Sequence, residues 1–257
     1  MPTPWSTAGA SLDANIESVF QLLDFDRVII DVAVDGLKGL EAELETKNLH
    51  NPVRLVANRR RMLANLATNE SLRPQYETMF NQCVVLLVSY FGSGVHTLFR
   101  AGVVTALRSG ADLPVDREAL TVSWHGLERA EGEREAIFAD LLVAQKDISF
   151  QDMKSIGRAF GELLEVTIER GGDVNNIILG QAARHAIVHA GGIVDRRMVK
   201  QLSGVLPRTL KAKVVAGESL RFTPPEVREL AKSMRAYVRN LGQALDRTFG
   251  SVETGSA

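Results

Sequence analysis

Asp173 to Ala190, with the sequence DVNNIILGQAARHAIVHA, is the stretch that decides the fold. Glycine pairs bracket it at positions 171–172 and 191–192. Asp173 suits an N-cap, because its carboxylate can accept hydrogen bonds from the free amides of a first helical turn. The second glycine pair supplies the left-handed residues that commonly close a helix. This bracketing predicts one helix of about 18 residues with apolar side chains at helical spacing. The predicted apolar stripe consists of Val174, Ile177, Ile178, Ala182 and Val188.

The run RHAIVH, from Arg184 to His189, fits a pattern of Arg, a polar residue, three variable residues and His. With this run the chain resembles the HEPN superfamily (higher eukaryote and prokaryote nucleotide-binding domains), all-helical proteins that include many metal-independent ribonucleases. The continuation through Gly191-Gly192 to Asp195 is similar to the HEPN branch in which a Gly-containing turn and a hydrophobic–Asp step follow the histidine. The resemblance implies an RNA substrate, bacterial defence or toxin biology, and a homodimer in which two motif helices share one cleft. It also implies control by a regulatory or antitoxin protein.

Two positions depart from the family pattern. Relatives often carry an acidic residue near the middle of their first core helix, whereas the corresponding segment 93–97 here has none. Some relatives carry a tyrosine two residues after the motif histidine, where a partner antitoxin transfers AMP to it. Gly191 stands at that position, so any partner control must act in another way.

The three polar residues of the run match the needs of RNA cleavage without a metal. A base must take the proton of the attacking 2′-hydroxyl, an acid must serve the leaving oxygen, and fixed positive charge must stabilise the phosphorane. Histidine can perform either proton step, and arginine presents a planar fork to phosphate oxygens. We therefore interpret His189 as the proton-transfer group, Arg184 as the phosphate clamp and His185 as a polar positioning residue. No cofactor and no metal are required.

Helix geometry predicts that one copy of this helix makes an incomplete site. Arg184 and His189 are five residues apart and point roughly 140° from each other, whereas His185 and His189 share a face. A composite site, completed by the second subunit of a homodimer, would resolve this difference.

A basic segment follows the run. Between Arg184 and Lys213 seven basic residues stand against one acid, Asp195, in a chain whose net charge is −1. This excess could follow an RNA backbone, or the cations could be ordinary surface residues. The predicted RNA-binding residues are Arg196, Arg197, Lys200, Arg208, Lys211 and Lys213.

Composition describes an ordinary globular protein of 257 residues with a single cysteine, Cys83, which excludes an intramolecular disulfide. The first residues lack the pattern of a signal peptide, and the most apolar stretch, 83–91, is too short to span a bilayer. We expect a cytoplasmic protein without membrane contact.

The predicted fold class is all-α, a HEPN-like helical bundle with extra N-terminal helices. Residues 1–10 are expected to be disordered, 11–249 to form one domain, and 250–257 to be a disordered tail. Within the domain we place N-terminal helices in 11–68 and the core bundle in 75–249. A loose alternation around Ala216-Gly217 could form a short β-hairpin between Leu210 and Phe222. Further helices are expected at 11–23, 27–47, 53–68, 75–109, 131–146, 149–168, 195–202 and 224–249.

Other interpretations remain open at this point. The chain could be a non-catalytic HEPN-like module that binds RNA, a nucleotide or a protein, because a fold does not fix an activity. It could be a helical scaffold in which both histidines satisfy buried hydrogen bonds. Histidines at i and i+4 can also bind zinc, although no glutamate of an HExxH motif and no cysteine cluster accompanies them. Trp124-His125 could stack on a base or anchor a loop.

Overall fold

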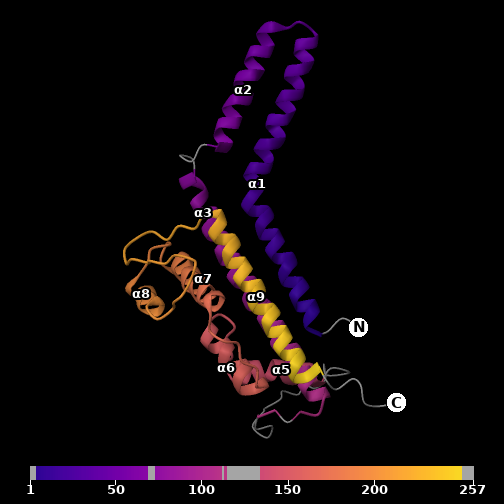
Figure 1. Cartoon of the computed structure of the whole chain (residues 1–257), viewed down its shortest axis with the longest axis vertical. Coiled ribbons are helices and arrows are strands. Elements are labelled where there is room, and N and C mark those ends of the chain that lie inside the picture. Colours follow the sequence, from indigo (N-terminus) through magenta and orange to yellow (C-terminus); the bar gives the residue numbers. More distant parts are fainter. Residues whose placement is uncertain (1–3, 69–72, 112, 115–133, 251–257) are drawn as a thin grey trace, which may run out of the picture.

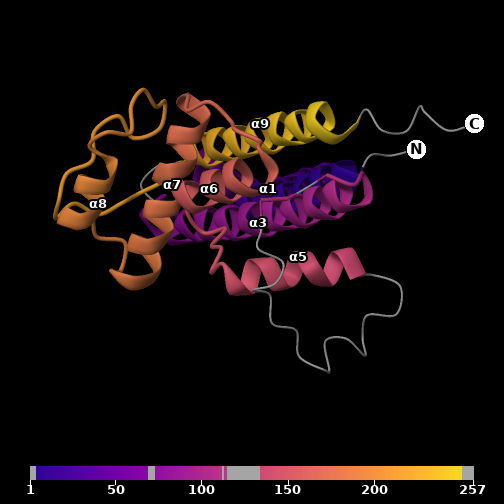
Figure 2. The same ribbon diagram turned by 90° about the horizontal axis from the view of Figure 1, so that it is seen from below.

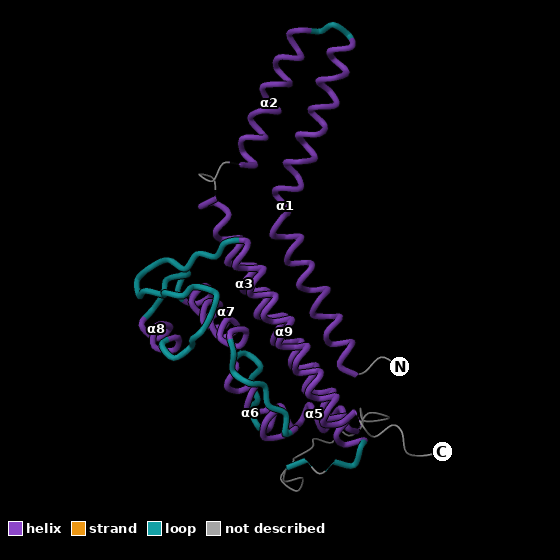
Figure 3. Tube along the Cα trace, viewed as in Figure 1, coloured by secondary structure: helices purple, strands orange, loops and turns teal. Residues whose placement is uncertain are grey.

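The regular structure of the protein is helical, which confirms the all-α prediction. The computed structural model describes residues 4–68, 73–111, 113–114 and 134–250. The expectations for 251–257 and for Trp124-His125 lie outside these residues. The described helices, purple in Figure 3, are α1 (Pro4–Thr46), α2 (His50–Thr68), α3 (Arg73–Arg108), α5 (Arg134–Gln145), α6 (Met153–Leu164), α7 (Gly172–His189), α8 (Arg196–Leu202) and α9 (Pro224–Phe249).

Helices α3 and α9 form the centre of the bundle, and the first half of α1, α5, α6 and α7 pack around them (Figures 1 and 2). Phe91 of α3 meets Tyr237 of α9 edge to face, with ring centroids 5.7 Å apart. As predicted, α3 is one long core helix, and it runs unbroken through Gly92. A Cβ at Gly92 would lie 3.0 Å from the carbonyl oxygen of Phe150, so glycine permits the 148–152 loop to approach. The segment Thr78–Arg108 could cross a membrane by length and apolarity, but 56% of its apolar window is buried in the protein, as in an ordinary core helix.

The N-terminal part of the chain differs from the prediction. We expected disorder up to residue 10 and two helices separated near Leu23, but α1 is a single helix that begins at Pro4. Trp5 is buried, and its indole nitrogen donates a hydrogen bond to Asp246 of α9, which fixes the first turn to the bundle. The charged residues Asp24, Asp26 and Arg27 interrupt the apolar spacing, but segment 24–27 contains neither Gly nor Pro, so nothing there ends the helix.

Beyond residue 24, α1 leaves the bundle and pairs with α2 in an antiparallel helical hairpin, here called the arm (residues 25–65). Figure 1 shows the arm standing away from the helices around α9. Glu41 and Arg60 join its two helices through an ion pair of 2.8 Å. Pro52 occupies the first turn of α2, as predicted.

Helix caps explain several of the remaining boundaries. Asp195 caps α8 as predicted, since its carboxylate accepts a hydrogen bond from the amide of Met198. Two predicted caps are wrong. Asp152 caps α6 in place of Ser149, and Gly171 is the N-cap of α7, so Asp173 lies in the first turn without a capping hydrogen bond.

The expected β-hairpin between Leu210 and Phe222 does not form in the described chain. This segment instead lies antiparallel to the turn after α7, and the described bridge joins Ile193 to Ser219. The amide of Gly217 donates to the carbonyl of Val194, and the amide of Leu220 donates to that of Gly192. The backbone groups that a hairpin would pair internally are therefore used to hold the α7–α8 turn.

Candidate functional site

Helix α7 lies against both central helices, which fixes the direction of its last turn. Gly180 sits at the crossing, where a Cβ would be 2.9 Å from a methyl of Leu230 and 3.5 Å from a methyl of Val88. Of the predicted apolar stripe, Ile177 and Ala182 are buried and Val174 and Ile178 partly buried, but Val188 is 51% exposed. The last turn of α7 therefore extends beyond the core, and its side chains reach solvent.

His185 and His189 form a pair at this end of α7. Both are exposed, and their ring centroids are 4.8 Å apart. Their spacing of four residues puts them on one face, as the sequence predicts. Two imidazoles within contact distance can divide the roles of proton acceptor and donor.

Arg184 lies apart from the histidine pair. It is partly buried, and its Nε is enclosed without a hydrogen-bond partner among the described residues. Within the described chain, no hydrogen bond or ring contact joins it to His185 or His189. This arrangement agrees with the divergence of about 140° worked out from helix geometry. A single chain thus presents two histidines together and the arginine on another face.

The turn after α7 directs the chain back beside this end of the helix. Gly191 and Gly192 have φ values of 59° and 77°, the left-handed conformation that favours glycine. The amide of Gly192 donates to the carbonyl of Ala186, which closes the helix, and Asp195 then starts α8. The predicted end of α7 is confirmed.

The six predicted RNA-binding residues separate into two groups. Arg196, Arg197, Lys200 and Lys213 are exposed. Arg208 is partly buried, burial lowers the pKa of its guanidinium, and its hydrogen bonds reach the carbonyls of five residues between 202 and 212. Lys211 lies 2.9 Å from Glu226 and over the ring of Phe222. Arg208 and Lys211 are thus engaged in holding the 203–222 loop, and the other four are available to a polyanion.

Three asparagine side chains, which the sequence reasoning missed, fix this loop to the helices. Asn176, 1% exposed, accepts hydrogen bonds from the amides of Thr209 and Leu210, each at 3.2 Å, and donates to Ser233. Asn175 donates to the carbonyl of Pro207, and Asn81 of α3 bonds the backbone of 220 and 222. The sequence contained a signal for this role: asparagine is unfavourable inside a helix, so asparagines at helix-interior positions indicate side-chain amides with specific hydrogen-bond partners.

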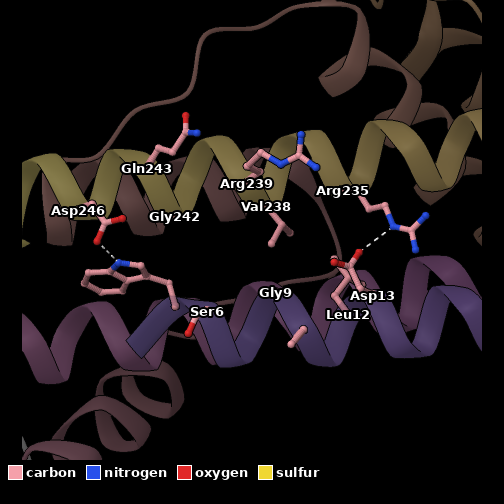
Figure 4. A pocket seen from close by; sticks show the side chains of 12 residues that line it. Ser6, Gly9, Leu12, Asp13, Arg235, Val238, Arg239, Gly242, Gln243 and Asp246 are labelled. Carbon is pink, nitrogen blue, oxygen red and sulfur yellow. Dashed lines mark hydrogen bonds and ion pairs between the residues drawn. The ribbon is translucent and has the colours of Figure 1, made fainter. Parts of the chain in front are cut away.

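None of the described pockets is lined by the histidine pair. The pocket in Figure 4, about 410 Å³, runs between α1 and α9, where Gly9 and Gly242 leave room beside Val238. Arg235 and Asp13 close one end through an ion pair of 2.7 Å. An apolar pocket of about 300 Å³ lies between α6, α7 and α9. Neither is lined by Arg184, His185 or His189. In the described residues, no group of three or more His, Cys, Asp or Glu side chains could hold a metal ion.

Comparison with protein-family models, with curated proteins and with solved structures gave no match to this chain.

Proposed function

We propose that the protein is a metal-independent endoribonuclease of the HEPN type. The observation that carries the proposal is the exposed pair of His185 and His189, which follow Arg184 by one and five residues. The pair lies beside a turn that leads into the cations of α8. The pair offers proton transfer, and the cations offer electrostatic attraction to a phosphate backbone.

The proposed reaction is attack of a 2′-hydroxyl on the adjacent phosphorus. The hydroxyl proton passes to one imidazole, the 5′-oxygen leaves with a proton from another acid, and a 2′,3′-cyclic phosphate remains. His189 is the principal proton-transfer group, and His185 positions it. Arg184 of a second subunit clamps the phosphate, because the two groups diverge within one subunit. Arg196, Arg197, Lys200 and Lys213 then hold the flanking RNA.

The biological setting we propose is a cytoplasmic toxin or antiphage-defence nuclease restrained by a regulatory partner. The sequence pattern at Arg184–His189 supports this setting through its resemblance to HEPN proteins.

A second candidate is a non-catalytic RNA-binding module of the same type. The position of both histidines outside the main described pockets favours it, because an open surface excludes little water from a developing charge. In that case the cations of α8 bind RNA and the histidines add contacts only.

The test is RNA cleavage by the purified full-length protein in excess EDTA. We expect products that end in 2′,3′-cyclic phosphate, and loss of about a hundredfold or more in rate for His189→Ala and for Arg184→Ala. His50→Ala is the matched control, since His50 is an exposed histidine on α2. Mixing the two inactive variants tests the composite site: mixed dimers regain cleavage if each supplies the group that the other lacks.

The outcomes separate the candidates. Salt-sensitive RNA binding without cleavage, weakened by Arg197→Ala but not by Arg54→Ala on α2, selects the binding module. Cleavage at full rate in both motif variants would refute the proposed catalytic roles.

A further inference from the structure

The outer face of the arm carries a stripe of large apolar side chains that the described fold leaves exposed. Phe25, Val28, Ile29 and Val32 are 60%, 55%, 52% and 66% exposed. At about 100° per residue they lie on one face of α1, away from the side that packs on α2. An exposed apolar stripe of this kind usually marks an interaction surface.

Two glycines continue the same face. Gly36 and Gly39 are inside α1, and a Cβ at either would meet nothing within 4 Å. Glycine weakens a helix relative to alanine, and no internal contact of the described chain requires it here. Small residues on one face of a helix allow a second helix to approach closely, so these positions fit a contact with another chain.

The stripe is complementary to itself. In an antiparallel pair with its two-fold axis at Val32, residue numbers that face each other add up to 64. Phe25 then faces Gly39, and Val28 faces Gly36, so two of the large side chains each meet a glycine. Val32 meets Val32 of the second copy at the axis, and Ile29 faces Asp35. A two-fold axis repeats both contacts.

The ends of the stripe fit in the same register. Leu40, 43% exposed, would lie over position 24 of the second copy. There a hollow of about 410 Å³ is lined by residues that include Phe20, Phe25 and Arg228.

From this shape complementarity we infer that the arm binds a second copy of the chain, helix α1 against helix α1, antiparallel about Val32. The contact is separate from pairing across α7 and does not depend on the proposed nuclease activity. If both contacts form, the chain assembles beyond a dimer, and the arm supplies one step of that assembly.

Cysteine cross-linking of the full-length protein tests the register. The single native cysteine, Cys83, is fully buried and does not interfere. Val32→Cys is expected to form a disulfide-linked dimer under mild oxidation. Leu55→Cys, at a position 60% exposed on the other helix of the arm, is the matched control and should remain unlinked.

A mixture of Phe25→Cys and Gly39→Cys proteins fixes the orientation. Antiparallel packing gives the mixed dimer, whereas Phe25→Cys linked to itself would show a parallel pair and overturn the proposed arrangement. Equal cross-linking of Val32→Cys and Leu55→Cys would show random collision and overturn the interface.

Sedimentation velocity over a range of concentrations supplies an independent measurement. Val32→Glu places two like charges at the axis, and we expect arm-mediated association to weaken more than about tenfold. Met62→Glu, at an exposed position of α2, should associate like the wild type. Gly36→Leu should also weaken the contact between the arms of two copies, while the helical circular dichroism signal stays unchanged. A wild-type protein that is monomeric at every concentration, or a Val32→Glu variant that associates like the wild type, would refute the inference.

Discussion

Replacement of Asn176 by alanine tests whether buried amides hold the site together. The side chain joins α7 to the 203–222 loop through hydrogen bonds with Thr209, Leu210 and Ser233. Alanine leaves the buried amide of Leu210 and the partly buried amide of Thr209 without acceptors, and each unsatisfied group costs about 1–3 kcal/mol. The higher helix propensity of alanine stabilises the folded state by only about 0.5 kcal/mol. We therefore expect the free energy of unfolding to fall by about 2–5 kcal/mol.

Urea unfolding followed by circular dichroism measures this loss. With a slope of about 3 kcal/mol per molar for a chain of this size, the midpoint should fall by about 1 M. Limited proteolysis should also cut the 203–222 loop faster. Asn240→Ala is the control, because Asn240 is exposed on α9. A midpoint unchanged within about 0.2 M, with unaltered proteolysis, would refute the structural role of Asn176.

Two further changes probe the packing of the bundle. Gly180→Val should lower the free energy of unfolding by about 1–3 kcal/mol, because the valine side chain would overlap the buried Leu230. Gly157→Ala should raise the free energy of unfolding by up to about 1 kcal/mol, because the space around Gly157 is open and alanine favours a helix. Urea unfolding measures both changes. Burial raises the pKa of the Cys83 thiol from 9.0 to about 11. The unfolded thiol ionises first, so stability present below pH 9 should be lost as the pH rises towards 11, and Cys83→Ala should lessen this loss. A thiol reagent at pH 8 should label Cys83 only after unfolding, and labelling at the same rate in the native protein would contradict the burial.

Three boundaries set by short-range chemistry were predicted correctly, although the caps expected at Ser149 and Asp173 were not. The left-handed Gly191-Gly192 pair ends α7, the carboxylate of Asp195 starts α8, and Pro224-Pro225 opens α9, where Thr223 and Glu226 form a capping box. Each of these signals acts within one helical turn, so the sequence alone contains it.

Boundaries that depend on distant contacts were not predictable in this way. The first turn of α1 is helical because Trp5 reaches Asp246, more than two hundred residues away. The sequence also could not show which of the candidate RNA-binding cations are free to bind a ligand. Arg208 and Arg197 are equivalent in a charge count, but only the loop geometry reveals that Arg208 is committed to backbone carbonyls.

The candidate site combines an open surface with a rigid support. His185 and His189 are exposed on the last turns of α7, where side chains are free to move, but the direction of α7 is fixed by its crossing at Gly180. The asparagines near its start hold the 203–222 loop, and the other end of that loop lies against the turn that leads into α8. The cations of α8 thereby keep a constant position relative to the histidines. Such preorganisation supports the proposal that this surface binds a phosphate backbone together with the corresponding surface of a second subunit, since both contacts need one fixed geometry.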